Sequence, residues 1–381
     1  MNLHLMYTVR AVAALLGVSA LVACGGSDSE NTGSSGTGGS GHLSVGARNE
    51  LIQKGVNKYF GKTPASGQTT NAAGDTVYSF DPSSGAVCFK GEPFKIVVHE
   101  TTSENLLIYL EGGGACWRDL CAAKEKASEA IAKTGICDQD ASKNVVGDWN
   151  IVYVSYCDGS VFSGDNDTTG PDGTPWMFHG LRNLSAAIDV AKSRFPSPAR
   201  ILLAGSSAGG YGTLAGTGVV RLQYPETELF VFNDAGLGLS NPDNPSMLEH
   251  IKADWKFDQF VPDSCTECKA GQQTALISWG LKNDPTLKAS AFSAFEDRTI
   301  GTTFLGMQGP AFKALLLAET GKVHDAFPTR FERFMIAGEQ HTALIGNYYT
   351  SIVDGMPLSD FTRAMIEGTA GWTDHLENGG N

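Results

Sequence analysis

Short hydrophobic runs without polar alternation recur along the chain. The clearest are Asn105–Glu111, Asn150–Cys157 and Arg200–Gly205, and further candidates are Glu228–Asp234, Lys288–Phe295 and Arg333–Gly338. Strands of a parallel sheet that is covered on both faces have this pattern, because none of their positions faces water. Two earlier runs, Val77–Phe80 and Phe94–Glu100, are separated by Pro and Gly turn signals and are also predicted to be strands.

A helical pattern lies between two of these runs. In Gly180–Phe195, small and aliphatic residues recur at helical spacing. Alternation of strand and helix indicates an α/β layer fold with a mostly parallel sheet. Ligands of such folds bind beyond the carboxyl ends of the strands, so the functional residues should follow the hydrophobic runs.

The N-terminus carries a different kind of apolar segment. Arg10 precedes Ala11–Ala23, which is too short to span a bilayer and has the length of a secretory signal core. It ends in Leu-Val-Ala-Cys, which resembles a bacterial lipobox; a plain signal peptide is the alternative. We predict a lipoprotein signal peptide at 1–23, lipidation of Cys24, and an exported protein anchored to a membrane in the bacterial periplasm or at the cell surface.

Composition sets the remaining boundaries. The Gly- and Ser-rich segment 24–47 predicts a flexible tether, and 48–381 is left for one large domain. A formal charge of -13 argues against a nucleic-acid partner, since phosphate contacts need clustered Lys and Arg. Asp165–Gly170 resembles the start of a calcium loop, but Trp176 stands where a bidentate Glu is required. This segment is therefore not predicted to bind calcium. We also predict no other metal and no cofactor, and we expect a monomer.

Seven cysteines follow Cys24, so one thiol is left over if the others pair. Candidate pairs are Cys88 with Cys157, Cys116 with Cys121, and Cys265 with Cys268, leaving Cys137, although connectivity does not follow from sequence. The Cys265–Cys268 spacing also fits half a zinc site or a redox pair. In an exported protein without a second ligand pair nearby, a structural disulfide is favoured.

The most informative motif is Gly-Ser-Ser-Ala-Gly at 205–209, which follows a predicted strand and precedes a predicted helix. It matches the G-x-S-x-G turn that presents a nucleophilic serine, here Ser207. Together with the alternation of strand and helix, this turn predicts an α/β-hydrolase-like three-layer sandwich with a mostly parallel central sheet. Ser206 is the alternative nucleophile. A phosphate-binding turn is another interpretation, but this segment lacks the Lys that a P-loop requires. Four glycines in the following helix, Gly210, Gly212, Gly216 and Gly218, predict that the helix packs unusually close to the sheet.

Acyl transfer also needs oxyanion donors, a base and an orienting acid. The backbone amide of Ala208 and amides of the loop Gly112–Gly114, with Gly113 and Gly114 as the candidates, could bind the oxyanion. His341 follows a buried run and is the predicted base, whereas His324 and His375 are predicted to be solvated. Asp297 is the predicted acid, with Asp284 and Asp234 as competitors.

Several of these segments together resemble the pectin acetylesterase and Notum family of serine carboxylesterases. The resemblance runs through LIYLEGGGACW, SYCDGSVFSGD and ARILLAGSSAGGYGTL, and covers most of the chain from Cys88 to His341. It implies the same catalytic residues, Ser207, Asp297 and His341, and supports the pairs Cys88–Cys157 and Cys116–Cys121. It also implies metal-free hydrolysis of a carboxylic ester.

The substrate follows less directly. We predict removal of O-acetyl groups from polysaccharide, with two alternatives: an esterase or depolymerase acting on lipid or polyester acyl esters, and a non-catalytic binding module on a hydrolase scaffold. Trp117, Phe162 and Trp176 are candidates to line an acyl pocket or stack on a sugar, or simply to fill the core.

Overall fold

A computed structural model describes residues 41–380 of the chain. The predicted signal peptide at 1–23, the lipidation site Cys24 and most of the tether predicted at 24–47 lie outside the described residues, and they stay predictions. Within the described part, none of the helices is both long and apolar enough to cross a membrane.

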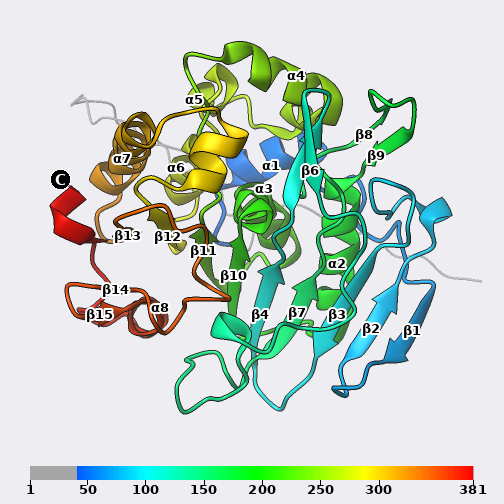
Figure 1. Cartoon of the computed structure of the whole chain (residues 1–381). Coiled ribbons are helices and arrows are strands. Elements are labelled where there is room, and N and C mark those ends of the chain that lie inside the picture. Colours follow the sequence, from blue (N-terminus) through cyan, green and yellow to red (C-terminus); the bar gives the residue numbers. More distant parts are fainter. Residues whose placement is uncertain (1–40, 381) are drawn as a thin grey trace, which may run out of the picture. The chain divides into compact units, whose positions relative to one another are not determined.

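A ten-stranded sheet organises the fold, in the order β1-β2-β3-β7-β4-β10-β11-β12-β13-β16 (Figure 1). The first four strands pair antiparallel and all pairs from β7 to β16 are parallel. Every predicted hydrophobic run overlaps one strand of this sheet, and the mostly parallel arrangement is confirmed. The strands are β1 Gly67–Thr70, β2 Thr76–Ser79, β3 Lys95–His99, β4 Asn105–Leu110, β7 Asn150–Val154, β10 Arg200–Ser206, β11 Glu228–Asp234, β12 Lys288–Ala294, β13 Phe331–Ile336 and β16 His375–Leu376.

Successive residues of the central strands face two different apolar layers. In β10, Ile201 and Leu203 belong to one hydrophobic cluster, and Leu202 and Ala204 belong to the other. All four side chains are fully buried. The absence of polar alternation in the sequence therefore reflects a sheet that is covered on both faces.

The two covering layers differ in content. One contains residues of α1, α2, α3, α6 and α7, and the other is built on α8 and on irregular segments. Together with the sheet they form the predicted three layers. The helices are α1 Val45–Gln53, α2 Gly180–Arg194, α3 Ala208–Gln223, α4 Pro245–Trp255, α5 Thr266–Ala270, α6 Ala275–Asn283, α7 Gly309–Ala326 and α8 Leu358–Glu367.

Small hairpins stand apart from the main sheet in the described residues. They pair β5 Gly114–Trp117 with β6 Leu120–Ala123, β8 Asn166–Thr169 with β9 Pro175–Phe178, and β14 Ile352–Val353 with β15 Met356–Pro357. Figure 1 shows β6 and α4 above the ends of β4 and β10, where ligands of parallel sheets bind.

The folded domain begins slightly earlier than the sequence indicates. Helix α1 starts at Val45, within the last residues of the predicted tether, and the Ser44 hydroxyl caps it by accepting from the amide of Ala47. The amide of Ser44 also donates to the carbonyl of Asn283. Composition alone predicts a tether here, because neither the hydrogen bond that caps the helix nor the burial of Leu51 can be recognised from composition.

Candidate active site

Ser207 forms the sharp turn between β10 and α3. Its backbone has φ 56° and ψ −119°, a region that residues with a side chain rarely occupy and that costs about 1–3 kcal/mol. A Cβ on Gly205 would lie 2.3 Å from the carbonyl oxygen of Gly209, and a Cβ on Gly209 would lie 1.9 Å from that of Leu110. Glycine is therefore required on both sides of Ser207.

The glycines within α3 let the helix approach its neighbours. A Cβ on Gly210 would lie 2.7 Å from the carbonyl oxygen of Asp234, and one on Gly212 would lie 2.6 Å from the ring of Phe162. Gly216 faces a leucine of β10, as predicted for a helix close to the sheet. Gly218 differs, because it faces Leu51 of α1.

Three residues that are far apart in the sequence meet at this turn. His341 Nε2 lies 2.8 Å from Ser207 Oγ, and His341 Nδ1 lies 2.8 Å from Asp297 Oδ2. The Asp297 side chain is fully buried, and that of His341 is 21% exposed. Asp297 follows β12 and is fixed by a second contact, since its Oδ1 accepts from the amide of Ile300. His341 follows β13, so all three side chains reach the same edge of the sheet.

The two competing carboxylates have other partners. Asp234, at the end of β11, accepts hydrogen bonds from the hydroxyl of Ser206 and from the amides of Ala343 and Leu344. Burial raises its pKa to about 6. Asp234 thus holds the loop that begins at His341, a role that sequence reasoning missed. Asp284 instead forms a buried ion pair with Arg221, at 2.7 Å.

The glycine loop after β4 lies directly against the turn. A Cβ on Gly112 would be 2.7 Å from the carbonyl oxygen of Ser206 and 3.1 Å from Ser207 Cβ. Gly114 and Ala208 line a cavity together with Ser207. Gly113 packs against the ring of Tyr156, which would be 2.4 Å from an added Cβ.

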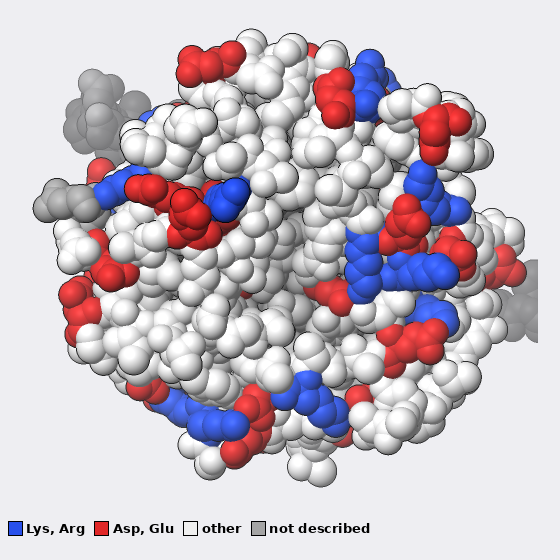
Figure 2. All heavy atoms as spheres, viewed as in Figure 1, with Lys and Arg blue, Asp and Glu red and all other residues white. Residues whose placement is uncertain are grey.

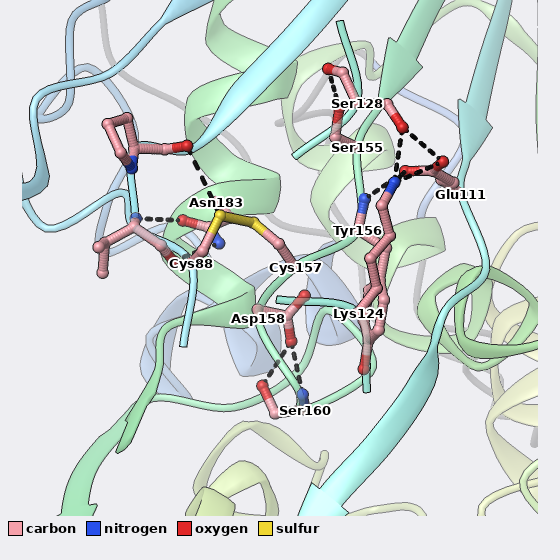
Figure 3. The surroundings of a disulfide bond; sticks show 12 residues. Cys88, Glu111, Lys124, Ser128, Ser155, Tyr156, Cys157, Asp158, Ser160 and Asn183 are labelled. Carbon is pink, nitrogen blue, oxygen red and sulfur yellow. Dashed lines mark hydrogen bonds and ion pairs between the residues drawn. A yellow bond between two sulfur atoms is a disulfide. The ribbon is translucent and has the colours of Figure 1, made fainter. Parts of the chain in front are cut away.

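An ion pair beside the glycine loop was also missed by the sequence analysis. The carboxylate of Glu111 accepts from Lys124 Nζ at 2.7 and 2.8 Å, from Ser128 Oγ at 2.8 Å and from the amide of Tyr156 at 3.0 Å. Figure 3 shows these groups converging on Glu111. Because Glu111 immediately precedes the glycines, its contacts fix the entry of the loop. Its place at a strand end was the only signal in the sequence.

The YCDG-x-x-F-x-G-D run forms a tight, internally bonded loop. Asp158 is buried and accepts from the amide and hydroxyl of Ser160 (Figure 3). It also accepts from the amide of Phe162, and both Val161 and Phe162 have positive φ. Burial raises the pKa of Asp158. The carboxylate thus supports a strained turn against α3.

Three disulfides join the predicted pairs. They are Cys88–Cys157, Cys116–Cys121 and Cys265–Cys268. The first ties the YCDG run to the segment before β3 (Figure 3), and the second closes the β5–β6 hairpin. Cys137 is the free cysteine among the described residues, and it is buried.

A cavity of about 180 Å³ opens beside Ser207 and follows α3. Its walls are mainly apolar and include Tyr211, Leu214, Ala215 and Trp117. Figure 2 shows that this face of the molecule carries its charged side chains mostly around the periphery, with acidic and basic groups interspersed. The cavity can therefore receive an apolar group next to the serine.

The other predicted side chains lie elsewhere. Phe162 and Trp176 are buried in the core, packed on Tyr156 and on Phe89 respectively, and neither lines the cavity. The prediction that His324 and His375 are solvated is wrong. Both are half-buried, because α7 and β16 pack on β13 and shield side chains whose sequence neighbours are charged.

Comparisons with known proteins agree with this arrangement. The sequence profile of the pectinacetylesterase family matches residues 69–275, which contain the glycine loop and Ser207 but end before Asp297 and His341. Pectin acetylesterase 5 of Arabidopsis thaliana is 32% identical over 181 residues, which are 43% of this chain and 42% of the relative. The palmitoleoyl-protein carboxylesterase notum1a of Danio rerio is 26% identical over 248 residues, 57% of this chain and 49% of the relative.

The chain spans about half the length of these curated relatives. The profile match, however, extends over more than half of the chain and includes the β4 loop, the YCDG run and the serine turn. The chain belongs to the pectinacetylesterase family.

Proposed function

We propose that this protein is a carboxylic ester hydrolase in which Ser207 is the nucleophile, His341 the general base and Asp297 the residue that orients His341. The observation that carries the proposal is the continuous chain of two 2.8 Å contacts from Asp297 through His341 to Ser207. Nucleophile, base and orienting acid in that geometry are the requirements for serine-dependent acyl transfer.

The geometry suggests how each group acts. With its proton on Nδ1, His341 donates to Asp297 and accepts the Ser207 hydroxyl proton at Nε2. Ser207 Oγ then attacks the ester carbonyl, and His341 passes the proton to the departing alcohol. In the second half-reaction, Nε2 takes a proton from water, the water oxygen attacks the acyl group on Ser207, and His341 returns the proton to the serine. Asp297 orients the His341 ring through Nδ1 and stabilises the imidazolium that forms.

The negative charge on the tetrahedral intermediate needs fixed donors. We propose the amide of Ala208, at the start of α3, and amides of Gly113 and Gly114. Ala208 and Gly114 both border the cavity beside Ser207. The dipole of α3 points its positive end toward the same place. One donor of this kind typically contributes a factor of about 10² to 10³ to the rate.

The non-catalytic alternative requires Ser207 and His341 to be too far apart to interact. Their 2.8 Å separation favours the enzyme. Ser206 is a weaker candidate for the nucleophile, because it is 6% exposed and already bonded to Tyr109 and Asp234.

The test of the nucleophile is hydrolysis of p-nitrophenyl acetate by Ser207→Ala, with Ser206→Ala as the matched control. We expect Ser207→Ala to lower kcat by roughly 10⁶, and Ser206→Ala to retain a large part of the activity. Hydrolysis by Ser207→Ala at the wild-type rate would refute the proposal that Ser207 is the nucleophile.

Two substrate classes are supported by different observations. Family membership and the relative named a pectin acetylesterase support removal of O-acetyl groups from polysaccharide. The apolar cavity favours a longer acyl chain, which would lie along α3. Because an acetyl group would leave most of this cavity empty, we propose that chains longer than acetyl are accepted.

A substitution inside the cavity distinguishes the two substrate classes, acetyl esters and esters with longer acyl chains. Ala215 lines it about 12 Å along α3 from Ser207. We expect Ala215→Phe to lower kcat/KM for p-nitrophenyl octanoate by about tenfold or more and to leave that for the acetate nearly unchanged. Equal effects on both esters would argue against acyl binding in the cavity.

A further inference from the structure

A cluster of ligating side chains lies away from the serine. His324 is in the last turn of α7, Glu332 is the second residue of β13, and Asp374 immediately precedes β16; Figure 1 shows α7 and β13 at one end of the sheet. One ligating atom from each residue lies within 4.8 Å of the others. The opposite end of β13 leads to His341, so the cluster and the candidate active site are at different ends of this strand.

The spacing of the cluster suits a small cation. His324 Nδ1 lies 3.5 Å from Glu332 Oε2 and 3.4 Å from Asp374 Oδ1. Two ligand atoms that bind zinc tetrahedrally at about 2.0–2.1 Å stand about 3.4 Å apart. The three side chains could therefore reach one ion once the His324 ring turns away from the carbonyl of Phe331.

Glu332 supplies an independent indication. Its side chain is 4% exposed, and its Oε2 atom has no hydrogen-bond partner among the described residues. A buried carboxylate oxygen without a donor is costly, and a cation would satisfy it. The side chains of His324 and Asp374 are 22% and 20% exposed, which leaves an entry route from solvent.

Two neighbouring contacts oppose or modify binding. His324 Nδ1 lies 2.9 Å from the carbonyl oxygen of Phe331, so its proton must move to Nε2 before Nδ1 can bind a metal. The guanidinium of Arg333 bonds Asp374 Oδ2, and its positive charge lowers the affinity for a cation. The same bond holds Asp374 in place, with Oδ1 toward His324.

We propose that His324, Glu332 and Asp374 bind one zinc ion, with water as a fourth ligand. One imidazole and two carboxylates fit zinc better than calcium, which takes six to eight oxygens. The ion would tie the end of α7 to β13 and to the short edge strand β16. It is a structural site, so it is independent of the proposed esterase function. The ligands are separated by up to 50 residues and match no ligand motif, which is why the sequence analysis predicts no metal.

The experiment measures zinc binding by tag-free full-length protein after removal of metal with a chelator. Zinc is titrated against a chromophoric competitor, and thermal unfolding is followed with and without zinc. Glu332→Gln and His324→Gln each remove one ligand. Asp325→Asn is the matched control, because Asp325 is exposed, adjacent to His324 and outside the cluster.

We expect one zinc per chain in the wild type and in Asp325→Asn, and a loss of affinity of at least about tenfold in each ligand variant. At a zinc concentration about 100 times Kd, Tm should rise by about 4 °C in the wild type and not in the ligand variants. Binding of zinc by both ligand variants with wild-type affinity, or no stoichiometric binding by the wild type, would overturn the proposal. Since His341 could also bind zinc, zinc binding of unchanged affinity in both ligand variants would indicate that the ion binds at His341 and not at the cluster.

Discussion

Replacing Asp234 by Asn should change how stability depends on pH. The carboxylate is fully buried and accepts from the amides of Ala343 and Leu344, next to His341. Burial is the largest cause that raises its pKa, from 3.8 to about 6. A carboxyl whose folded pKa is raised contributes stability that is present below pH 3.8 and is lost as the pH rises through 6.

The magnitude follows from that interval. A shift of about two pKa units corresponds to about 3 kcal/mol between the two limits, and about 2 kcal/mol of it falls between pH 7 and pH 4.5. Asparagine has no such titration. The wild type should therefore gain about 2 kcal/mol in free energy of unfolding relative to Asp234→Asn when the pH falls from 7 to 4.5.

Urea unfolding followed by tryptophan fluorescence at the two pH values measures this difference directly. Taking the difference between wild type and variant removes the contributions of all other titrating groups. Because the amide of Ala343 contacts both carboxylate oxygens, the NH2 group of Asn would face that N–H in either orientation, so we expect a lower kcat/KM through displacement of His341. A difference in unfolding free energy that is independent of pH would refute the reasoning.

Two further substitutions test the site. Asp297→Asn should lower kcat/KM by roughly 10⁴, because a neutral amide favours the wrong tautomer of His341; Asp284→Asn should lower it far less but cost about 3–5 kcal/mol of stability, because Arg221 loses its buried partner. Comparable activity losses in the two variants would contradict this assignment. Gly209→Ala should lower both Tm and activity, because its Cβ would stand 1.9 Å from a carbonyl oxygen of the β4 backbone; unchanged thermal unfolding and p-nitrophenyl acetate hydrolysis would show that the turn tolerates a side chain.

The sheet was largely predictable because its central strands are buried on both faces. Residues of β10 such as Leu202 and Leu203 face opposite layers, and neither layer admits water. A continuous apolar run of this kind is enough to predict a buried strand. The edges are different: β16 is only two residues long, His375–Leu376, and depends on pairing with β13. Such a strand has no local pattern to recognise.

The serine turn was predictable for a related reason. Gly205 is demanded by a clash with the backbone of Gly209, four residues later, and such a local constraint appears in the sequence as a short motif. Gly209 is demanded by the carbonyl of Leu110 in β4, but it belongs to the same motif. The roles of Glu111 and Asp234 depend instead on which distant segments approach them. Asp234 is bonded to residues more than a hundred positions away, and only the folded chain reveals that contact. Aromatic residues were similarly ambiguous, since Trp117 borders the cavity while Trp176 fills the core.

The most direct test of the central claim is to find the atom that becomes covalently modified by an active-site-directed fluorophosphonate. The protein is incubated with the reagent, digested and analysed by tandem mass spectrometry, with residual p-nitrophenyl acetate hydrolysis measured in parallel. The account predicts one phosphonyl group per chain on Ser207, appearing in step with loss of activity, because His341 removes the proton from that hydroxyl alone. Modification of Ser206 instead, or complete loss of activity with Ser207 unmodified, would contradict it.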